Sequence, residues 1–327
     1  MAVIEQLPSL YDEPFADSSQ IPTLLVSRLA RQHVTVSLSG DAGDELFCGY
    51  RRYLMAAGAW KQISRVPTPI RRLMAGGMKS IPPDAWNQLA ALTNRALPAK
   101  MRLQNLGDKL HKAARVLDSP STAMLYRGLT SHWSDPASVV LGGPEPPTLI
   151  WGDTPDMPGL SEVQRMMLLD VLTYLPDDVL TKIDRAAMGV SLETRVPFLD
   201  HRIVEFAWSL PQSLLLREGK SKWLLRQVLY RHVPETLIER PKMGFGVPLD
   251  AWLRGPLREW AEALLDERRL HQEGYFDAAP IRKKWNEHLT GQQNWSYDLW
   301  DILMFQSWLE NQSQAMSSLD VLAHDGR

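Results

Sequence analysis

Residues 23–55 constrain the fold more than any other part of this sequence, because four local patterns follow one another there. Apolar residues at helical spacing over 23–32 predict a helix. The β-branched and apolar run at 33–38 predicts a buried strand. Small residues at 39–43 predict a turn, and a second helix is expected over 44–55. This order is typical of an α/β nucleotide-binding sheet.

The predicted turn places acidic side chains beside a helix start. Unpaired N–H groups and the helix dipole favour anions there, phosphate among them. Asp41, Asp44 and Glu45 would repel a phosphate directly. A Mg²⁺ ion between the carboxylates and the phosphate would allow both to occupy this place. Acidic residues are also favoured at helix N-termini without any ligand, so Asp41 or Asp44 fits an N-cap equally well. The spacing leaves both interpretations open.

The rest of the chain is expected to be mainly helical. Prolines divide 56–158 into short pieces, and two glycines with three prolines predict a surface loop at 141–147. The tryptophans of 159–312 recur at helical spacings that fit a core better than a ligand platform. Residues 313–327 are polar and are expected to fray. We predict one domain over 1–312, with an α/β part at 1–55 and helical parts at 56–158 and 159–312.

A second polar segment begins at residue 175. Asp178, Lys182 and Arg185 follow one another at steps of four and three, which places them on one helix face. The plain interpretation is an exposed ladder of ion pairs, each contributing about 0.3–0.5 kcal/mol.

Two charged residues further along the same segment need a different explanation. Glu193 and Arg195 adjoin the apolar run 196–199, which looks buried. Charges beside a buried run require a partner, either structural or a zwitterionic substrate. Asp200 precedes a new helical pattern and is predicted to be its N-cap.

A third segment, 240–248, combines two glycines, two prolines and one lysine in a shaped loop. Lys242 can offer a compact positive charge to phosphate oxygens. An ordinary solvated lysine fits the same composition.

Composition narrows the classes of partner. The formal net charge of −2 gives no electrostatic reason to expect nucleic acid or an anionic membrane. One cysteine, Cys48, excludes an intrachain disulfide and suits a reducing compartment. The opening residues, with Glu5 and Pro8, do not read as a signal peptide, and no apolar run reaches the length of a membrane span. A cytoplasmic protein is expected.

Taken together, these segments resemble the ATP-dependent synthetase domain of the glutamine-hydrolysing asparagine synthetase family. Residues 38–47, Leu-Ser-Gly-Asp-Ala-Gly-Asp-Glu-Leu-Phe, are similar to its Ser-Gly-acid-small-small-Asp-Glu signature. Residues 175–200 are similar to its Leu-Pro…Lys-x-Asp-Arg…Glu-x-Arg-x-Pro-Phe-Leu-Asp run. Residues 219–222 and 240–245 match two later loops in order, and 12–22 match the stretch before the signature. The resemblance covers nearly the whole chain and favours the phosphate site over the cap.

The resemblance implies an α/β fold, with part of an ATP-pyrophosphatase sheet of the adenine-nucleotide alpha-hydrolase type and a large, mainly helical remainder. It also implies a reaction in which the side-chain carboxylate of aspartate attacks the α-phosphate of ATP. The products are β-aspartyl-adenylate and pyrophosphate, and ammonia, drawn from glutamine in the full enzyme, then displaces AMP to give asparagine.

Roles for single residues are implied in the same way. Ser39 and Gly40 would contact ATP, and Asp41 takes the position of an acidic residue important for adenylate formation. Asp44 would hold Mg²⁺ on the pyrophosphate, and Lys242 would neutralise charge on the phosphates, as a displacement at phosphorus requires. Candidates for lining the substrate site are Asp184, Arg185, Glu193 and Arg195.

The chain also departs from the family pattern. It has no Ser-Gly-Gly-x-Asp-Ser phosphate loop and no glutaminase domain with its N-terminal cysteine, since residue 2 is Ala. Cys48 is expected to be a packed small residue. We therefore expect a chain that is truncated or is one half of a split enzyme, not competent alone, with an unpaired sheet edge. A separate chain would then carry the missing parts.

Two alternatives remain at this point. A non-catalytic remnant or binding subunit would explain the absent phosphate loop. An amide-forming enzyme acting on a different carboxylate would keep the chemistry and change the acceptor.

Overall fold

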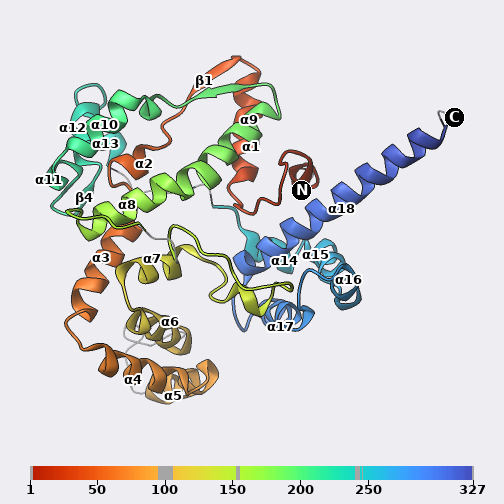
Figure 1. Ribbon diagram of the computed structural model, residues 1–327, viewed down its shortest axis with the longest axis horizontal. Helices are drawn as coiled ribbons and strands as arrows, with labels where there is room; N and C mark the ends of the chain where they lie inside the picture. Colours follow the sequence, from red (N-terminus) through yellow and green to blue (C-terminus); the bar gives the residue numbers. More distant parts are fainter. Residues whose placement is uncertain (1–2, 95–105, 152–154, 240–243, 245, 326–327) are drawn as a thin grey trace.

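The computed structural model describes residues 3–94, 106–151, 155–239, 244 and 246–325. Within these ranges the chain forms two short sheets and is otherwise mainly helical, with β1 at the upper edge of the view in Figure 1. Strand β1 (Val36–Leu38) pairs in parallel with β2 (Glu193–Arg195). Strand β3 (Leu216–Arg217) forms an antiparallel pair with β4 (Lys220–Ser221). The first pair joins two segments that lie far apart in the sequence.

The helices divide by position in the chain. Before residue 155 they are η1 (Ile4–Ser9), α1 (Gln20–Arg31), α2 (Gly43–Leu46), α3 (Arg51–Ile63), α4 (Thr68–Lys79), α5 (Pro83–Asn94), α6 (Leu106–Asp118), α7 (Thr122–Thr130) and η3 (Pro136–Ser138). After it come α8 (Glu162–Leu172), the π-helix η4 (Leu175–Leu180), α9 (Thr181–Met188), η5 (Pro197–Leu199), α10 (His201–Ser209), α11 (Gln212–Leu215), α12 (Trp223–Leu229), α13 (Glu235–Ile238), α14 (Leu249–Arg254), α15 (Arg258–Leu264), α16 (Glu267–Glu273), α17 (Ala278–Leu289) and α18 (Ser296–Asp325).

The first strand is shorter and more open than its sequence predicts. The helix expected at 23–32 is confirmed as α1, but only Val36–Leu38 of the run 33–38 is a strand. The expectation of a buried strand is wrong, because the side chain of Leu38 is 73% exposed and that of Val36 40%. Among the described residues β1 pairs only with β2, so its other edge is unpaired, as the sequence predicts.

The helix expected over 44–55 is also wrong, because the chain breaks in its middle. Helix α2 ends at Leu46, and α3 begins only at Arg51. Between them Cys48 adopts a left-handed φ of 57°, which no α-helix continues through. Cys48 is fully buried, which confirms the packed small residue.

Two hydrophobic cores hold the described part together. One joins η1 and α1 to the helices from α14 to α18, with Trp285 and Trp300 fully buried, as the tryptophan pattern predicts. The other joins α2, α3, α7 and α8 around Tyr53, Tyr126 and Met166. The candidate site lies beside this second core, because α2 belongs to it.

A buried carboxylate ties three helices of the second core together. Asp170 on α8 accepts hydrogen bonds from Arg52 Nη2 at 2.6 Å, Tyr53 Oη at 2.5 Å and Tyr126 Oη at 2.6 Å. The Arg52 guanidinium also lies over the ring of Tyr50, 3.8 Å from its centroid. These contacts bind α3 and α7 to α8 through one acidic group.

Of the remaining predictions about secondary structure, two are confirmed and one is only partly consistent with the structure. The exposed loop at 141–147 is confirmed, as is the N-cap, since the Asp200 carboxylate accepts from the N–H of Arg202 at 3.0 Å at the start of α10. Part of the segment expected to fray, 313–327, is helical, because α18 continues to Asp325 and projects from the body (Figure 1). Among the helices that are described, none combines the length and apolar character needed to cross a membrane.

Candidate functional site

The acidic turn follows the carboxyl end of β1 directly. The chain leaves the strand at Leu38, turns through Ser39 to Ala42, and enters α2 at Gly43. The N-cap of α2 is Ala42, with a left-handed φ of 64° and no side-chain cap hydrogen bond. Neither Asp41 nor Asp44 therefore caps this helix, although Asp44 and Glu45 do lie in its first turn, where acidic residues are favoured.

The first residues of the turn combine an unpaired polar atom with open space. The N–H of Ser39 donates to the carbonyl oxygen of Arg195 at 2.9 Å, which extends the β1–β2 pairing by one bond. The Ser39 Oγ is buried and makes no hydrogen bond to any described residue. Because a buried hydroxyl without a partner is costly, this atom marks a place where a ligand oxygen or water would be stabilised. A Cβ at Gly40 would meet nothing within 4 Å, and Asp41 is half-exposed.

The other predicted metal ligand faces a lysine from a distant part of the chain. The Nζ of Lys222 lies 3.0 Å from the Oδ1 of Asp44. Lys222 follows the β3–β4 hairpin with a left-handed φ of 53°, and its N–H donates to the carbonyl oxygen of Phe47 at 3.2 Å. The hairpin therefore delivers a positive charge to the start of α2.

Two glycines make this close approach sterically feasible. A Cβ at Gly49 would lie 1.9 Å from Asp44 Oδ1 and 2.3 Å from Lys222 Cε. A Cβ at Gly43 would lie 3.2 Å from the Phe198 ring. The Asp44–Lys222 ion pair thus depends on the absence of a side chain at Gly49.

The three acidic residues of the turn have three different environments. Glu45 is buried against the core, and its carboxylate accepts from Tyr50 Oη at 2.6 Å. Burial raises the pKa of Glu45. Asp44 meets Lys222, and Asp41 remains half-exposed, so the three do not converge as the sequence predicts. In the described ranges no group of three or more His, Cys, Asp or Glu side chains is placed to hold a metal ion.

The predicted substrate residues separate into two places. Arg195 stands opposite Leu38 in the strand pair, beside the turn, and forms a 2.7 Å ion pair with Glu193. Both side chains are exposed, and the run 196–199 is only partly buried, so the expectation that their charges adjoin a buried segment is wrong. On α9, Asp184 is exposed and Arg185 pairs with Asp12.

The sequence pointed to one lysine as a site residue, Lys242, and the structure places another, Lys222, beside the turn. Lys242 lies outside the described residues, so its predicted role stays a prediction. Lys222 was missed as a site residue, although the match of 219–222 to a family loop included it. The only signal available was that match, because the contact with Asp44 depends on the hairpin and on Gly49.

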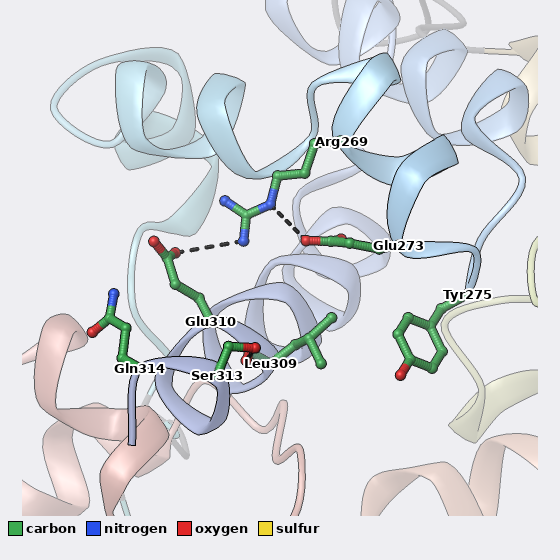
Figure 2. A pocket seen from close by; sticks show the side chains of 7 residues that line it. All are labelled: Arg269, Glu273, Tyr275, Leu309, Glu310, Ser313 and Gln314. Carbon is green, nitrogen blue, oxygen red and sulfur yellow. Dashed lines mark hydrogen bonds and ion pairs between the residues drawn. The ribbon is translucent and has the colours of Figure 1, made fainter. Parts of the chain in front are cut away.

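A cavity of about 820 Å³ lies elsewhere, between α16 and α18 (Figure 2). Its one arginine, Arg269, is held by Glu273 at 2.9 Å and Glu310 at 3.6 Å. Because these carboxylates already balance its charge, this cavity offers an anion no net attraction. The turn after β1 remains the better candidate.

Comparisons with known proteins assign a family to the part of the chain that contains this turn. The family model described as asparagine synthase matches residues 1–310. A putative glutamine-hydrolysing asparagine synthetase of Mycobacterium tuberculosis H37Rv is 34% identical over 312 residues, covering 94% of this chain and 44% of that protein. Asparagine synthetase 1 of Bacillus subtilis 168, also named as glutamine-hydrolysing, is 27% identical over 310 residues, covering 93% of this chain and 45% of that protein.

The chain therefore spans less than half the length of these relatives. A match that runs through the β1 turn, the β2 segment and the Lys222 hairpin is nonetheless a match to the part that carries the site. On this evidence the chain belongs to the asparagine synthase family.

Proposed function

We propose that this chain is the amide-forming part of an asparagine synthetase. Aspartate and ATP would give β-aspartyl-adenylate and pyrophosphate, and ammonia would then give asparagine and AMP. The observation that carries the proposal is the turn after β1, where an unpaired Ser39 hydroxyl, open space at Gly40 and the Asp44–Lys222 pair lie within one short segment. The relatives' names support the amide-forming reaction.

Each residue of the turn has a task that follows from its surroundings. The open backbone at Gly40 and the buried Ser39 hydroxyl receive phosphate oxygens of ATP, since a Cβ at Gly40 would meet nothing within 4 Å and the hydroxyl has no described hydrogen-bond partner. Asp41 takes part in adenylate formation, and Lys242 adds positive charge from its loop. The substrate aspartate is drawn to the charged groups of Glu193 and Arg195 beside the turn, with Asp184 and Arg185 as further candidates.

The donor set of the turn fits Mg²⁺ bound together with a nucleotide. Magnesium favours one or two carboxylates and completes its shell with phosphate oxygens and water, so Asp44 is a sufficient protein ligand. When bound, the ion would neutralise charge on the departing pyrophosphate. Lys222, 3.0 Å from Asp44, would be free to approach the phosphates if a cation took its place at that carboxylate.

The experiment is calorimetry with Mg²⁺ and ATP on the full chain. Asp44→Ala is expected to weaken binding at least about tenfold, because a charged ligand of the cation is lost. The matched control is Asp118→Ala, which removes a carboxylate paired with Lys79 on the surface and should leave binding unchanged. Equal affinity in the wild type and Asp44→Ala would show that the turn does not hold the metal.

The unpaired edge of β1 supports a proposal about the missing parts. Among the described residues β1 pairs on one side only. Its Val36 and Leu38 side chains are exposed, while the residues opposite them on β2 are the charged Glu193 and Arg195. Because charges discourage strand pairing and apolar residues invite it, the β1 edge is the side to be completed. We propose that segments carrying the phosphate loop and the glutaminase part complete the sheet, supplied by a separate or a preceding polypeptide. The expected compartment is the cytoplasm.

Leu38→Lys is expected to reduce self-association of the isolated chain, because it places a charge on the open edge. Size-exclusion chromatography with light scattering over a range of concentrations measures the effect. Met55→Lys changes another exposed apolar side chain, on α3, and serves as the control. If both variants associate as the wild type does, the β1 edge is not the adhesive surface.

A further inference from the structure

The N-terminal end of α1 is joined to the η4–α9 junction by a group of three charged side chains. The Nζ of Lys182 on α9 lies 2.5 Å from Asp17 Oδ2 and 3.7 Å from Asp178 Oδ1. All three side chains are largely withdrawn from water, with Lys182 only 12% exposed. Two carboxylates therefore share one ammonium group in a partly buried space.

The backbone around Asp178 is unusual. Asp178 lies in η4, a π-helical stretch between α8 and α9. Such stretches are rare and are found mostly at functional positions. The π-helix places Asp178 so that its Oδ1 is buried without a hydrogen bond to any described residue. The Tyr11 hydroxyl is likewise buried without a partner.

The charges of this group do not balance when both carboxyls are ionised. Burial and the neighbouring charge of Asp17 raise the pKa of Asp178 to about 7, although Lys182 opposes the shift. Burial alone would raise the pKa of Asp17, but Lys182 and hydrogen bonds from Ser19 outweigh it and lower that pKa. Asp17 therefore keeps its charge and Asp178 takes the proton.

The other titratable groups packed around Asp178 do not titrate in the same range. Tyr11 and Tyr174 both have a raised pKa, chiefly through burial, so their hydroxyls stay protonated. On α9, Arg185 is occupied by Asp12. These groups leave Asp178 as the titrating member of the cluster near neutral pH.

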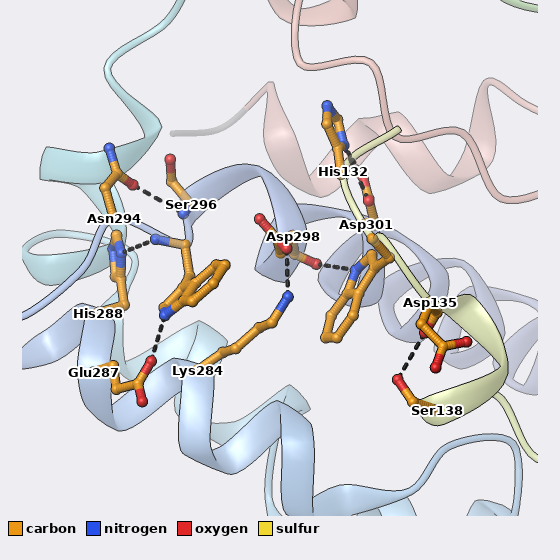
Figure 3. Close-up of polar contacts among 12 residues, drawn as sticks. His132, Asp135, Ser138, Lys284, Glu287, His288, Asn294, Ser296, Asp298 and Asp301 are labelled. Atoms are coloured by element: carbon orange, nitrogen blue, oxygen red, sulfur yellow. Dashed lines mark hydrogen bonds and ion pairs between the residues drawn. The ribbon is translucent and has the colours of Figure 1, made fainter. Parts of the chain in front are cut away.

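One further group lies within electrostatic reach of Asp17. His132, between α7 and η3, holds Asp301 of α18 through its Nδ1 at 3.0 Å (Figure 3). The hydrogen bond that the Asp301 carboxylate accepts from His132 raises the pKa of His132. Because histidine is the side chain that ordinarily changes its charge near neutral pH, any test must separate His132 from Asp178.

We propose that Asp17, Asp178 and Lys182 form a proton-operated latch that holds the N-terminal end of α1 to the η4–α9 junction. With a proton on Asp178, its carboxyl donates to Asp17, and Asp17 and Lys182 form a neutral ion pair. When that proton leaves to solvent, a net negative charge remains in the buried space and the latch loosens. The latch is connected to the candidate site through the chain, because α1 leads into β1 and α9 leads into β2. The evidence for the latch does not depend on the reaction proposed for that site.

The size of the effect follows from linkage between proton binding and opening. With a pKa of about 7 when closed and the ordinary carboxyl value when open, the opening equilibrium should increase about tenfold from pH 6 to pH 8. The direction is fixed, because the closed form binds the proton more tightly.

Hydrogen exchange with mass spectrometry tests the latch on the full chain, in peptides covering 17–25 and 174–185. After correction for intrinsic exchange rates, the wild type should lose about tenfold in protection between pH 6 and pH 8. Asp178→Asn, which cannot ionise, should remove that pH dependence. Asp177→Asn changes the exposed neighbour in the same π-helix and should retain it.

Two results would overturn the proposal. Either the wild-type protection does not change between the two pH values, or Asp178→Asn keeps the change. In the second case, loss of the change in His132→Gln would assign it to the histidine. NMR titration of the wild-type Asp178 carboxyl carbon gives an answer that needs no variant. A midpoint near 7 supports the latch, and a midpoint near the ordinary value ends it.

Discussion

Asp170→Ala is expected to lower the free energy of unfolding by about 3 kcal/mol, the low end for breaking a buried ion pair. The variant leaves three donors without their acceptor, the Arg52 guanidinium and the hydroxyls of Tyr53 and Tyr126. The low end applies because the Arg52 side chain keeps 24% of its surface exposed and can regain some water. Urea unfolding followed by circular dichroism measures the change.

The matched control is Asp118→Ala. Asp118 pairs with Lys79 at 2.7 Å, a distance like that of the buried pair, but both side chains are 42% exposed. An ion pair in water contributes at most about 1 kcal/mol, so this variant should unfold almost as the wild type does. Equal losses in the two variants would mean that Asp170 is not the group that binds α3 and α7 to α8.

Local signals in the sequence predicted local structure well. The spacing of apolar residues located α1, a single aspartate located the start of α10, and the tryptophan pattern identified a core with Trp285 and Trp300. Each of these features depends on residues within a few positions of one another. Periodicity and capping are rules about such neighbours.

The break between α2 and α3 was not predictable from the same rules. It needs a left-handed conformation at Cys48, a residue type with no preference for it. Tertiary packing imposes that conformation, since Cys48 is fully buried and Lys222 hydrogen-bonds to Phe47 just before it. Helix propensity depends on neighbouring residues alone, so it predicts a continuous helix here and takes no account of the burial of Cys48 or of the hydrogen bond from Lys222.

The candidate site was predicted in its position but not in its arrangement. Motif resemblance located the turn from Ser39 to Asp44, and the structure places an unpaired hydroxyl and an ion pair there. The sequence could not show that Glu45 faces the core toward Tyr50 or that Lys222 approaches Asp44. Both facts depend on side-chain direction and on a hairpin more than a hundred residues away.

The second large effect is expected from Gly49→Ala, which should separate Asp44 from Lys222 without unfolding the chain. The added Cβ would lie 1.9 Å from Asp44 Oδ1 and 2.3 Å from Lys222 Cε, so both side chains must move. The Cβ would also lie 2.7 Å from Asp44 Cγ, but all three atoms belong to side chains and none to the backbone, so the cost in stability should be about 1–3 kcal/mol. A crystal structure of the variant should show the ammonium and carboxylate more than 4 Å apart.

The same substitution at Gly58 gives the comparison, because a Cβ there meets nothing within 4 Å and α3 gains a better helix former. Because the added methyl group displaces the Asp44 carboxylate that would hold the cation, binding of Mg²⁺ and ATP should fall at least about tenfold in Gly49→Ala, as in Asp44→Ala. It should stay at the wild-type level in Gly58→Ala, where the added methyl group meets nothing within 4 Å. If Gly49→Ala keeps the ion pair and the affinity, the turn accommodates the added methyl group without displacing Asp44 or Lys222. The glycine would then serve the fold alone, and the close approach of Lys222 would have no part in holding a nucleotide.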